Sequence, residues 1–532
     1  MKPLHKLTVA LAYILICFGT YGWFLGNPFI LDDELQILEN THIQSLENLP
    51  SFFTSSTMGS GGGQQMTGIY YKPLMSSFFS LMWNFFGDQP AGFRWPLLIL
   101  HALSAFFIFL FSLRFFKAPF QKEWSFILGL FFLLHPINTE VILYLADAQD
   151  ILYMFFGLLS LVLLSRLEKN WNLGLSLILL FSASLLSKET GVLFLGIATA
   201  YAFLFERKKW PVVFGASILV FITYMSLRIS IGMVETRSPQ LLFHNADYLS
   251  RISMLPLILY HYLEIFFFPW RLSVSSDFLL PELNLENFWA PLAVCLFALA
   301  GLIQIGRFNF RQNREKEFSF YAFVLLLWFL LHTHVLVPLD GIYADRWLYL
   351  VSWAGLSLCL MTLQHWLIQK NILQMKLIKF LALLLAMAMI GRDFARGQDW
   401  SDPLQFYQRE AQLHPQDAAM NNNVGAILFR KGQVKDAMPY FDKATKINPP
   451  WGVAWNNLAA CYERERDDVN AEKYYLHAIS IQDYSLAYEN YAKLLYRKHR
   501  TKDLRQFLDS KALLKFPYNQ LLLNIKKETI NW

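Results

Sequence analysis

Long apolar runs separated by short polar turns dominate the first 395 residues of the chain. A run of about 20 mostly apolar residues can form a helix that crosses the roughly 30 Å hydrocarbon core of a membrane. Eleven runs come close to this length, and we expect each to be a membrane-spanning helix: 7–24, 95–116, 124–143, 150–166, 172–187, 190–206, 211–229, 288–306, 320–337, 346–367 and 376–392. The pattern therefore predicts an all-α, polytopic membrane protein.

The apolar segment 254–270 contains two prolines, a histidine and a glutamate, so it could cross the membrane or lie along its surface. Positive charge decides between the two, because lysine and arginine concentrate in cytoplasmic turns. The basic turns are Arg166 with Lys169, 207–209, 307–316 and 370–379. All of them share one side only if 254–270 does not cross. With a cytoplasmic N-terminus, eleven spans then place the C-terminal part on the outer side.

Composition supports this interpretation and excludes several functions. Apolar residues make up 55% of the chain and aromatic residues 17%, more than in ordinary soluble domains. The formal net charge is only +6, and the basic residues lie in turns instead of forming one nucleic-acid-binding face. The four cysteines have neither paired nor metal-ligand spacing, so we expect no disulfide framework. The run at 7–24 lacks a small-residue cleavage site, so we expect it to be retained as the first helix.

After Trp400 the sequence becomes polar and a repeat begins. Similar residues recur 34 positions apart: Phe406, Tyr440 and Tyr474; Pro415 and Pro449; Ala437 and Ala471; Ala444 and Ala478; Asn422 and Asn456. This is the period of the tetratricopeptide repeat, a pair of packed helices that stacks into an α-solenoid. We expect about three repeats, in a domain 396–532 that follows a membrane domain 1–395. Such a solenoid binds peptide-like partners or serves as a folding or oligomerisation module.

The first outer loop opens with the acidic cluster Asp32, Asp33 and Glu34, and no lysine or arginine follows until Lys72. Adjacent carboxylates raise one another's pKa and can act as a general base or bind a divalent cation. Acidic residues at a helix exit are also common solvated caps. The glycines at 61–63 in the same loop lack the Lys-Ser/Thr pair of a phosphate-binding loop, so we interpret them as a flexible spacer.

A second polar group lies at the outer end of the third predicted span and the start of the fourth. It contains His135, Asn138, Glu140, Asp147 and Asp150. Polar groups cost several kcal/mol in hydrocarbon, so this density indicates a hydrated cavity or a paired network. The alternative is a purely structural turn that breaks the helix.

Cations and carboxylates also meet at two further outer turns. Lys188 and Glu189 lie between two spans, and Arg228 lies near the outer end of the seventh. If they face the same cavity as Asp32, Lys188 and Arg228 can hold an anionic phosphate, whereas Lys188 and Glu189 could instead neutralise one another. Asp345 and Arg346 form another candidate pair, with an interfacial anchor as the alternative.

At these positions the chain resembles the transmembrane and tetratricopeptide-repeat-containing O-mannosyltransferases, and more distantly the protein O-mannosyltransferases, of the GT-C glycosyltransferase fold. The resemblance runs nearly end to end, and each motif is short. The motifs are Phe29 to Asp33 with Asn40; Tyr71, Lys72, Pro73, Leu74; Gly92, Phe93 to Leu100, His101; His135 to Glu140; Ser187 to Gly191; Arg228; and Ala344 to Tyr349. Their order and the attached repeats make the combination specific.

The resemblance implies a polyprenyl-phosphate-linked sugar as donor and a polypeptide hydroxyl as acceptor on the outer side of the membrane. Asp32, or its neighbour Asp33, would be the base, and either could hold a divalent cation if one is required. Cationic side chains would hold the donor phosphate: Lys188, Arg228 and Lys72. Further residues would shape the pocket: His135, Asn138, Glu140, Asp147, Asp150, Glu189, Tyr71, His101 and Arg346. The repeats would recruit the acceptor protein.

The chain departs from the family pattern at three places. Asn138 replaces a second histidine, the sequence Asp147 to Asp150 replaces Gly-Arg-Ala-Asp, and Lys72 replaces an arginine and loses its bidentate fork. The resemblance implies mannose as the sugar, because mannose is the family's default. Other hypotheses are a transferase that modifies a lipid or surface glycan, and a non-catalytic scaffold. The short loops favour a bacterial inner membrane with periplasmic repeats over the endoplasmic reticulum with lumenal repeats.

Overall fold

In the computed structural model the chain is helical almost throughout. The structure describes residues 3–57, 70–118, 120–232, 242–274, 276–280, 282–336, 338–339, 341–370 and 374–530, so the glycines at 61–63 lie outside the described residues. Across these ranges the sole β-type pairing is one isolated bridge between Ser276 and Tyr343. The predicted all-α class is confirmed.

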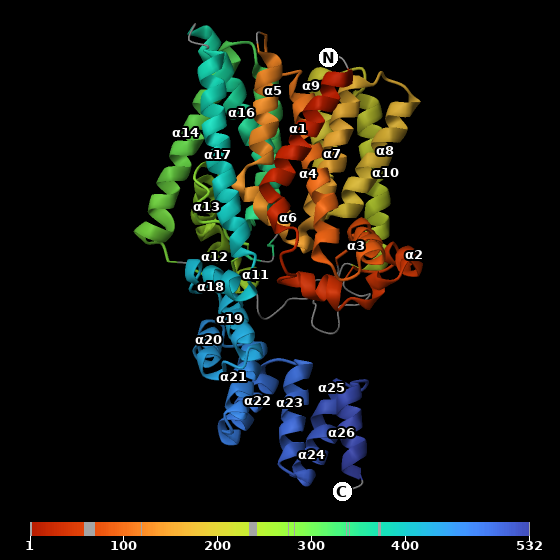
Figure 1. Ribbon diagram of the computed structural model, residues 1–532, viewed down its shortest axis with the longest axis vertical. Helices are drawn as coiled ribbons and strands as arrows, with labels where there is room; N and C mark the ends of the chain where they lie inside the picture. Colours follow the sequence, from red (N-terminus) through yellow and green to blue (C-terminus); the bar gives the residue numbers. More distant parts are fainter. Residues whose placement is uncertain are drawn as a thin grey trace.

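The first part of the chain folds into one bundle of long, roughly aligned helices (Figure 1). These helices are α1 (Pro3–Tyr21), α4 (Pro90–Ser112), α5 (Gln121–Leu133), α7 (Ala148–Arg166), α8 (Trp171–Ser187), α9 (Val192–Phe205), α10 (Trp210–Ile231), α14 (Ala290–Arg311), α15 (Glu315–His332), α16 (Leu348–Gln369) and α17 (Met375–Asp399). Shorter helices cover the end of the bundle that faces the repeats: α2 (Leu49–Phe52), α3 (Pro73–Phe86), α6 (Thr139–Leu143), α11 (Leu242–Asn245), α12 (Tyr248–Ser253) and α13 (Leu255–Phe267).

Six of the described helices are long and apolar enough to cross a membrane: Leu4–Phe24, Pro90–Ser112, Leu145–Arg166, Trp210–Ile231, Leu285–Arg311 and Asp345–Gln369. A seventh span is possible if Gln121–Leu133 and Pro136–Leu143, which meet at 45°, act together. The helices Trp171–Ser187 and Glu189–Phe205 are apolar but shorter. Each of the eleven predicted segments is mostly helical, but a count of eleven spans is not confirmed.

The segment 254–270 forms α13, which has 13 residues and is therefore about 20 Å long, too short to cross a hydrocarbon core of roughly 30 Å. Figure 1 shows α13 packed beside α14 in the half of the bundle that faces the repeats. That 254–270 does not cross stays a prediction.

The repeat domain extends from the end of the bundle as stacked helix pairs (Figure 1). Its helices are α18 (Pro403–Leu413), α19 (Ala418–Arg430), α20 (Val434–Ile447), α21 (Gly452–Arg464), α22 (Asp468–Ile481), α23 (Ser485–Arg497), α24 (Thr501–Phe507), α25 (Leu513–Lys515) and α26 (Gln520–Ile530). The recurring alanines and Phe406 are buried between the helices, as their period predicts, whereas the recurring Tyr440 and Tyr474 are half-buried. The boundary expected at 395–396 falls inside α17, which continues to Asp399.

The basic turns predicted to share one side do gather at one end of the bundle. There Arg114 pairs with Glu206 at 2.7 Å, and the Arg314 guanidinium donates to the Phe115 carbonyl. Lys379 lies 3.8 Å from Glu123 at the same end. The chain begins at this end, and the C-terminus lies at the far tip of the repeats (Figure 1). The loops that the sequence predicts to be outer lie at the opposite end of the bundle, which faces the repeats (Figure 1).

Candidate active site

Asp33 is buried and holds two neighbouring backbone amides. Its Oδ1 accepts a hydrogen bond from the Ala146 N–H at 2.7 Å, and its Oδ2 accepts one from the Leu145 N–H at 3.4 Å. Burial raises the pKa of Asp33 to about 7, although the charge of Arg94 and these N–H groups lower it. Asp33 therefore fixes the turn that leads into α7, and both of its oxygens are occupied.

Asp32, one residue earlier, has an exposed side chain. It lies close to Tyr407, whose pKa is raised by burial and further by the charges of Glu34 and Asp32. The Leu31 N–H donates to the Tyr407 hydroxyl at 3.2 Å, and Leu31 has a left-handed backbone with φ of 61°. Asp32 is thus the solvent-accessible carboxylate of the pair.

Arg346 joins two buried carboxylates into one cluster. Its Nη1 lies 2.6 Å from Glu140 Oε1 and its Nε lies 3.3 Å from Asp147 Oδ1. The Arg346 backbone N–H also donates to Glu140 Oε2 at 3.0 Å. Asp147 Oδ2 is buried and has no hydrogen-bond partner within the described part of the chain. A buried acceptor without a donor is costly, so this oxygen suits a ligand hydroxyl.

A second ion pair lies beside this cluster. The Lys188 ammonium contacts both oxygens of Asp150, at 2.7 and 2.8 Å, so of the two interpretations of this turn the structure does not show the alternative in which Glu189 neutralises Lys188. Lys72 is buried and its ammonium lies 4.5 Å from the centre of the Tyr70 ring. Burial lowers the pKa of Lys72, while the charge of Glu189 raises it and that of Lys188 lowers it further. Lys72, Lys188, Glu189 and Asp150 therefore share one charged neighbourhood.

Arg228 lies in the last turn of α10, next to an aromatic pair. Its Nη1 donates to the Gly232 carbonyl at 3.3 Å. Tyr224, one turn earlier, lies within the electrostatic reach of Arg228 and Glu189. The Tyr224 ring is 6.1 Å from that of Tyr71, whose hydroxyl donates to the Phe53 carbonyl at 3.0 Å. Tyr71 and Arg228 thus border the neighbourhood of Lys72.

His101, His135 and Asn138 bond to backbone carbonyls and a tyrosine hydroxyl instead of joining the ion pairs. His101 bonds to the Tyr349 hydroxyl at 2.7 Å and the Leu133 carbonyl at 3.1 Å. His135 bonds to the Phe266 carbonyl at 3.0 Å, and Asn138 donates to the Phe132 carbonyl at 2.6 Å. These residues order the turns around the clusters, and their direct role in a pocket stays a prediction.

Three residues that the sequence interpretation did not single out hold the site together. The buried Arg94 donates to the Leu143, Leu25 and Pro28 carbonyls, each at 3.1 Å, and so fixes the loop before Asp32. The sequence does give a signal for Arg94, since it is an ionisable residue directly before the apolar run 95–116. Tyr407 and Glu410, in the first helix after the bundle, carried no such signal because nothing in the repeat period marks them.

A divalent cation at Asp32 and Asp33 stays a prediction. Across the described ranges no group of three or more His, Cys, Asp or Glu side chains is arranged to hold a metal ion. The oxygens of Asp33 accept N–H groups, so a cation there would have to displace them or bind through Asp32.

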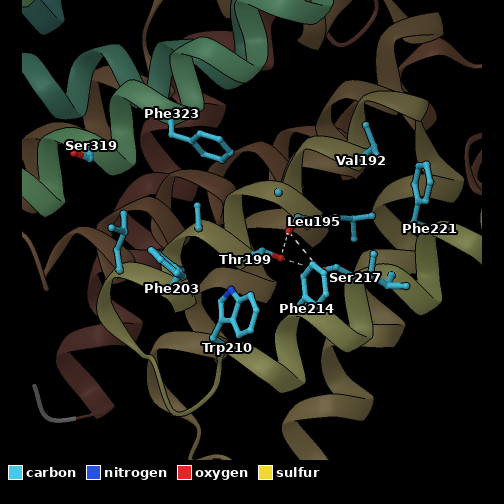
Figure 2. Close-up of a pocket in the computed structure, with 14 residues that line it drawn as sticks. Val192, Leu195, Thr199, Phe203, Trp210, Phe214, Ser217, Phe221, Ser319 and Phe323 are labelled. Carbon is cyan, nitrogen blue, oxygen red and sulfur yellow. Dashed lines mark hydrogen bonds between the residues drawn. The ribbon is translucent and has the colours of Figure 1, made fainter.

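An apolar cavity of about 600 Å³ opens between α9, α10 and α15 (Figure 2). Leu195, Phe203, Phe214, Phe221 and Phe323 line it. Its polar side chains include Thr199 and Ser217, which bond to the Leu195 carbonyl and to each other, so they offer little to a polar ligand. The cavity suits a hydrocarbon chain.

Comparison with known proteins gives a consistent picture. The tetratricopeptide repeat family matches residues 418–450. A protein O-mannosyl-transferase of Caenorhabditis elegans is 23% identical over 80% of this chain and 61% of its own length. Protein O-mannosyl-transferase TMTC3 of Homo sapiens is 22% identical over 93% of this chain and 57% of its own length. TMTC2 of Mus musculus is 31% identical over 26% of this chain and 17% of its own length.

The chain thus spans less than two thirds of the length of the long curated relatives it matches. The aligned part nevertheless includes both the bundle and the repeats, since it covers 93% of this chain in one case. The repeat match and these identities show that the chain is similar, over most of its length, to the transmembrane and tetratricopeptide-repeat-containing O-mannosyltransferases.

Proposed function

We propose that the protein is an integral-membrane glycosyltransferase that moves mannose from a polyprenyl-phosphate donor to serine or threonine hydroxyls of a protein on the outer side of the membrane. The observation that carries the proposal is the exposed Asp32, whose neighbour Asp33 binds the turn before Asp147, at the end of the bundle that also holds the Arg346 and Lys188 ion pairs. The names of the relatives supply the reaction class.

In the proposed reaction Asp32 accepts the proton of the acceptor hydroxyl. The hydroxyl oxygen forms a bond to the anomeric carbon of the sugar as the bond from that carbon to the phosphate oxygen breaks. The electron pair leaves with the polyprenyl phosphate, whose charge Lys72 and Arg228 would stabilise. Lys188 is neutralised by Asp150, so we assign it first to holding Asp150 and the start of α7 in place.

The donor would approach from the bilayer. The cavity between α9, α10 and α15 supports a lipid-linked donor because its lining is apolar (Figure 2). Asp147 Oδ2 offers a buried acceptor for a sugar hydroxyl. We also propose the eleven-span topology, with the basic turns in the cytoplasm and the repeats in the periplasm or the lumen of the endoplasmic reticulum. This topology requires the lysine- and arginine-rich turns to lie on one side of the membrane, and they do lie at one end of the bundle.

The repeats would present the acceptor protein. Four side-chain amides form a continuous ladder along the solenoid: Asn490 donates to Asn456 at 3.0 Å, Asn456 donates to Asn457 at 3.2 Å, and Asn457 donates to Asn422 at 2.9 Å. The ladder connects successive repeats and keeps the solenoid surface continuous. Peptide recognition by stacked helix pairs is the common use of this architecture.

Transfer by the full-length chain in lipid nanodiscs tests the proposal. The assay supplies polyprenyl-phosphate mannose and a serine- and threonine-rich protein, and it measures mannose on the protein. Asp32→Asn should lower kcat by about 10²–10⁴-fold, as expected for loss of a general base. Glu34→Gln is the matched control, because Glu34 is partly exposed and pairs with Arg430 at a long 3.6 Å, and it should change kcat less than about twofold.

Full activity of Asp32→Asn would overturn the assigned base. Donor turnover that yields a mannosylated lipid or glycan but no mannosylated protein would instead favour the second acceptor class. A wild-type chain that neither transfers nor hydrolyses the donor would favour a non-catalytic scaffold.

A further inference from the structure

The first helix of the repeat domain, α18, contacts both halves of the candidate active site. Tyr407 and Glu410 are three residues apart on this helix, so they lie on one face of it. Tyr407 reaches the loop that carries Asp32, and Glu410 reaches the segment that supports Arg346. The two contacts join residues more than 130 positions apart in the sequence.

Glu410 is fully buried, and both of its carboxylate oxygens have hydrogen-bond or ion-pair partners. Its Oε2 accepts from the Ser273 hydroxyl at 2.7 Å and from the Val274 N–H at 3.2 Å. Its Oε1 lies 2.9 Å from Arg396, which balances its charge. A carboxylate held by three donors fixes the position of the segment 273–274.

That segment in turn supports the Arg346 cluster. The Val274 carbonyl accepts a hydrogen bond from Arg346 Nη1 at 2.9 Å, and the same nitrogen lies 2.6 Å from Glu140. The Ser273 N–H donates to Asp345, the neighbour of Arg346, at 2.7 Å. Residues 273–274 are therefore held between Glu410 on one side and Asp345 and Arg346 on the other.

The loop of Asp32 is held from the same helix. The Tyr407 hydroxyl accepts a hydrogen bond from the Leu31 N–H, and Leu31 has a left-handed conformation that is uncommon for a non-glycine residue. Asn27, in the same loop, donates to the Gly397 carbonyl at 3.1 Å. The position of Asp32 thus depends on a contact from α18, beyond the bundle, and on one from the end of α17.

We propose that Tyr407 and Glu410 are positioning residues that set Asp32 and the Arg346 cluster at a fixed separation, so that α18 is part of the active site instead of a mere tether for the repeats. This inference rests on the proposed function. Apolar packing of Trp400 and Phe406 would be enough for docking alone, and a buried charge adds a desolvation cost that docking does not require.

The first test compares two tyrosine-to-phenylalanine variants of the full-length chain. Tyr407→Phe removes the acceptor of the Leu31 N–H and should lower kcat about tenfold, with KM for donor and acceptor within about twofold of wild type. Tyr475→Phe is the matched control, because its hydroxyl bonds to Glu463 in a distal repeat at 2.6 Å, and its kcat should be unchanged. An unchanged kcat in Tyr407→Phe, or an equal fall in both variants, would overturn the proposal.

The second test uses Glu410→Gln and hydrogen exchange, which does not depend on turnover. Exchange at the backbone amides of 29–34 and 344–346 should accelerate in Glu410→Gln and in Tyr407→Phe, while amides 166–170 at the opposite end keep the wild-type rate. Unchanged exchange near the site would refute positioning even where kcat falls. If the wild-type chain transfers no mannose, the proposed function fails, whereas the exchange result still decides whether α18 sets the geometry.

Discussion

Neighbouring aspartates in the loop after α1 have different surroundings, and this difference decides their roles. Asp33 faces inward and accepts two backbone N–H groups, while Asp32 faces solvent beside Tyr407. A carboxylate with both oxygens occupied is a poor base for a substrate proton. The sequence interpretation left the two open as the base, and this geometry favours Asp32.

The buried Asp33 gives a pH dependence to stability. Its folded pKa of about 7 lies above the unfolded value of 3.8, so its contribution to folding stability is fully present below about pH 4 and is lost as pH rises through 7. Asp33→Asn keeps an acceptor for Ala146 and stays neutral at every pH. The stability of the variant relative to wild type should therefore increase between pH 5 and pH 8, measured by unfolding in detergent. A constant difference across this range would contradict the pKa.

Lys188 and Asp150 should behave as a coupled pair. Lys188→Gln alone leaves the carboxylate of Asp150 buried and unpaired, which should destabilise the chain by about 3–5 kcal/mol. Lys188→Met combined with Asp150→Leu removes both charges and should recover most of that loss. Unfolding of Lys188→Met, of Asp150→Leu and of the double variant measures the coupling energy, and additive effects of the two changes would show that the pair is not coupled.

At the scale of elements, the turn between α8 and α9 shows how a small residue sets the position of a functional one. A Cβ at Gly191 would lie 2.5 Å from the backbone carbonyl carbon and oxygen of Ser184, atoms that no rotamer change can move away. The turn thus brings Lys188 close to the start of α7, where Asp150 lies.

Gly191→Ala should accordingly cost about 1–3 kcal/mol and weaken the Lys188–Asp150 pair. Gly174→Ala, within α8, is the control. A Cβ added at Gly174 would have Val212 Cγ1 as its nearest neighbour, at 3.4 Å, and alanine favours a helix over glycine by about 0.5–1 kcal/mol. Thermal unfolding of both variants distinguishes them. Equal stability of the two would contradict the close approach at Gly191.

Elements were the most predictable level of this chain. The apolar runs gave helices at all eleven predicted segments, and the 34-residue period gave the helix pairs of the repeat domain. Hydropathy alone could not settle the number of spans, because α15 and α17 carry charged residues within their length. The sequence could not show whether Lys188 pairs with Asp150 or with Glu189, since this depends on how α7 and α8 pack.

At the scale of the whole molecule, the bundle and the repeats form one unit around the candidate site. Arg396, Glu410 and Trp400 are buried where the two parts meet. Periodicity could not predict this joint, because it relates a residue to others in its own segment, whereas Tyr407 bonds to a residue 376 positions away. Removing residues 400–532 would therefore take away Tyr407 and Glu410 along with the repeats, so acceptor recruitment is better tested by changes in the distal repeats.

Mass spectrometry of envelope or lumenal proteins tests the central claim most directly. Cells that lack the chain are complemented with the wild-type chain, with Asp32→Asn or with the control Glu34→Gln, at matched membrane levels. The account predicts hexose on serine or threonine residues of outer-side proteins with the wild-type chain and with Glu34→Gln, and its loss with Asp32→Asn. The same modified sites in cells that carry Asp32→Asn, or in cells without the chain, would contradict it.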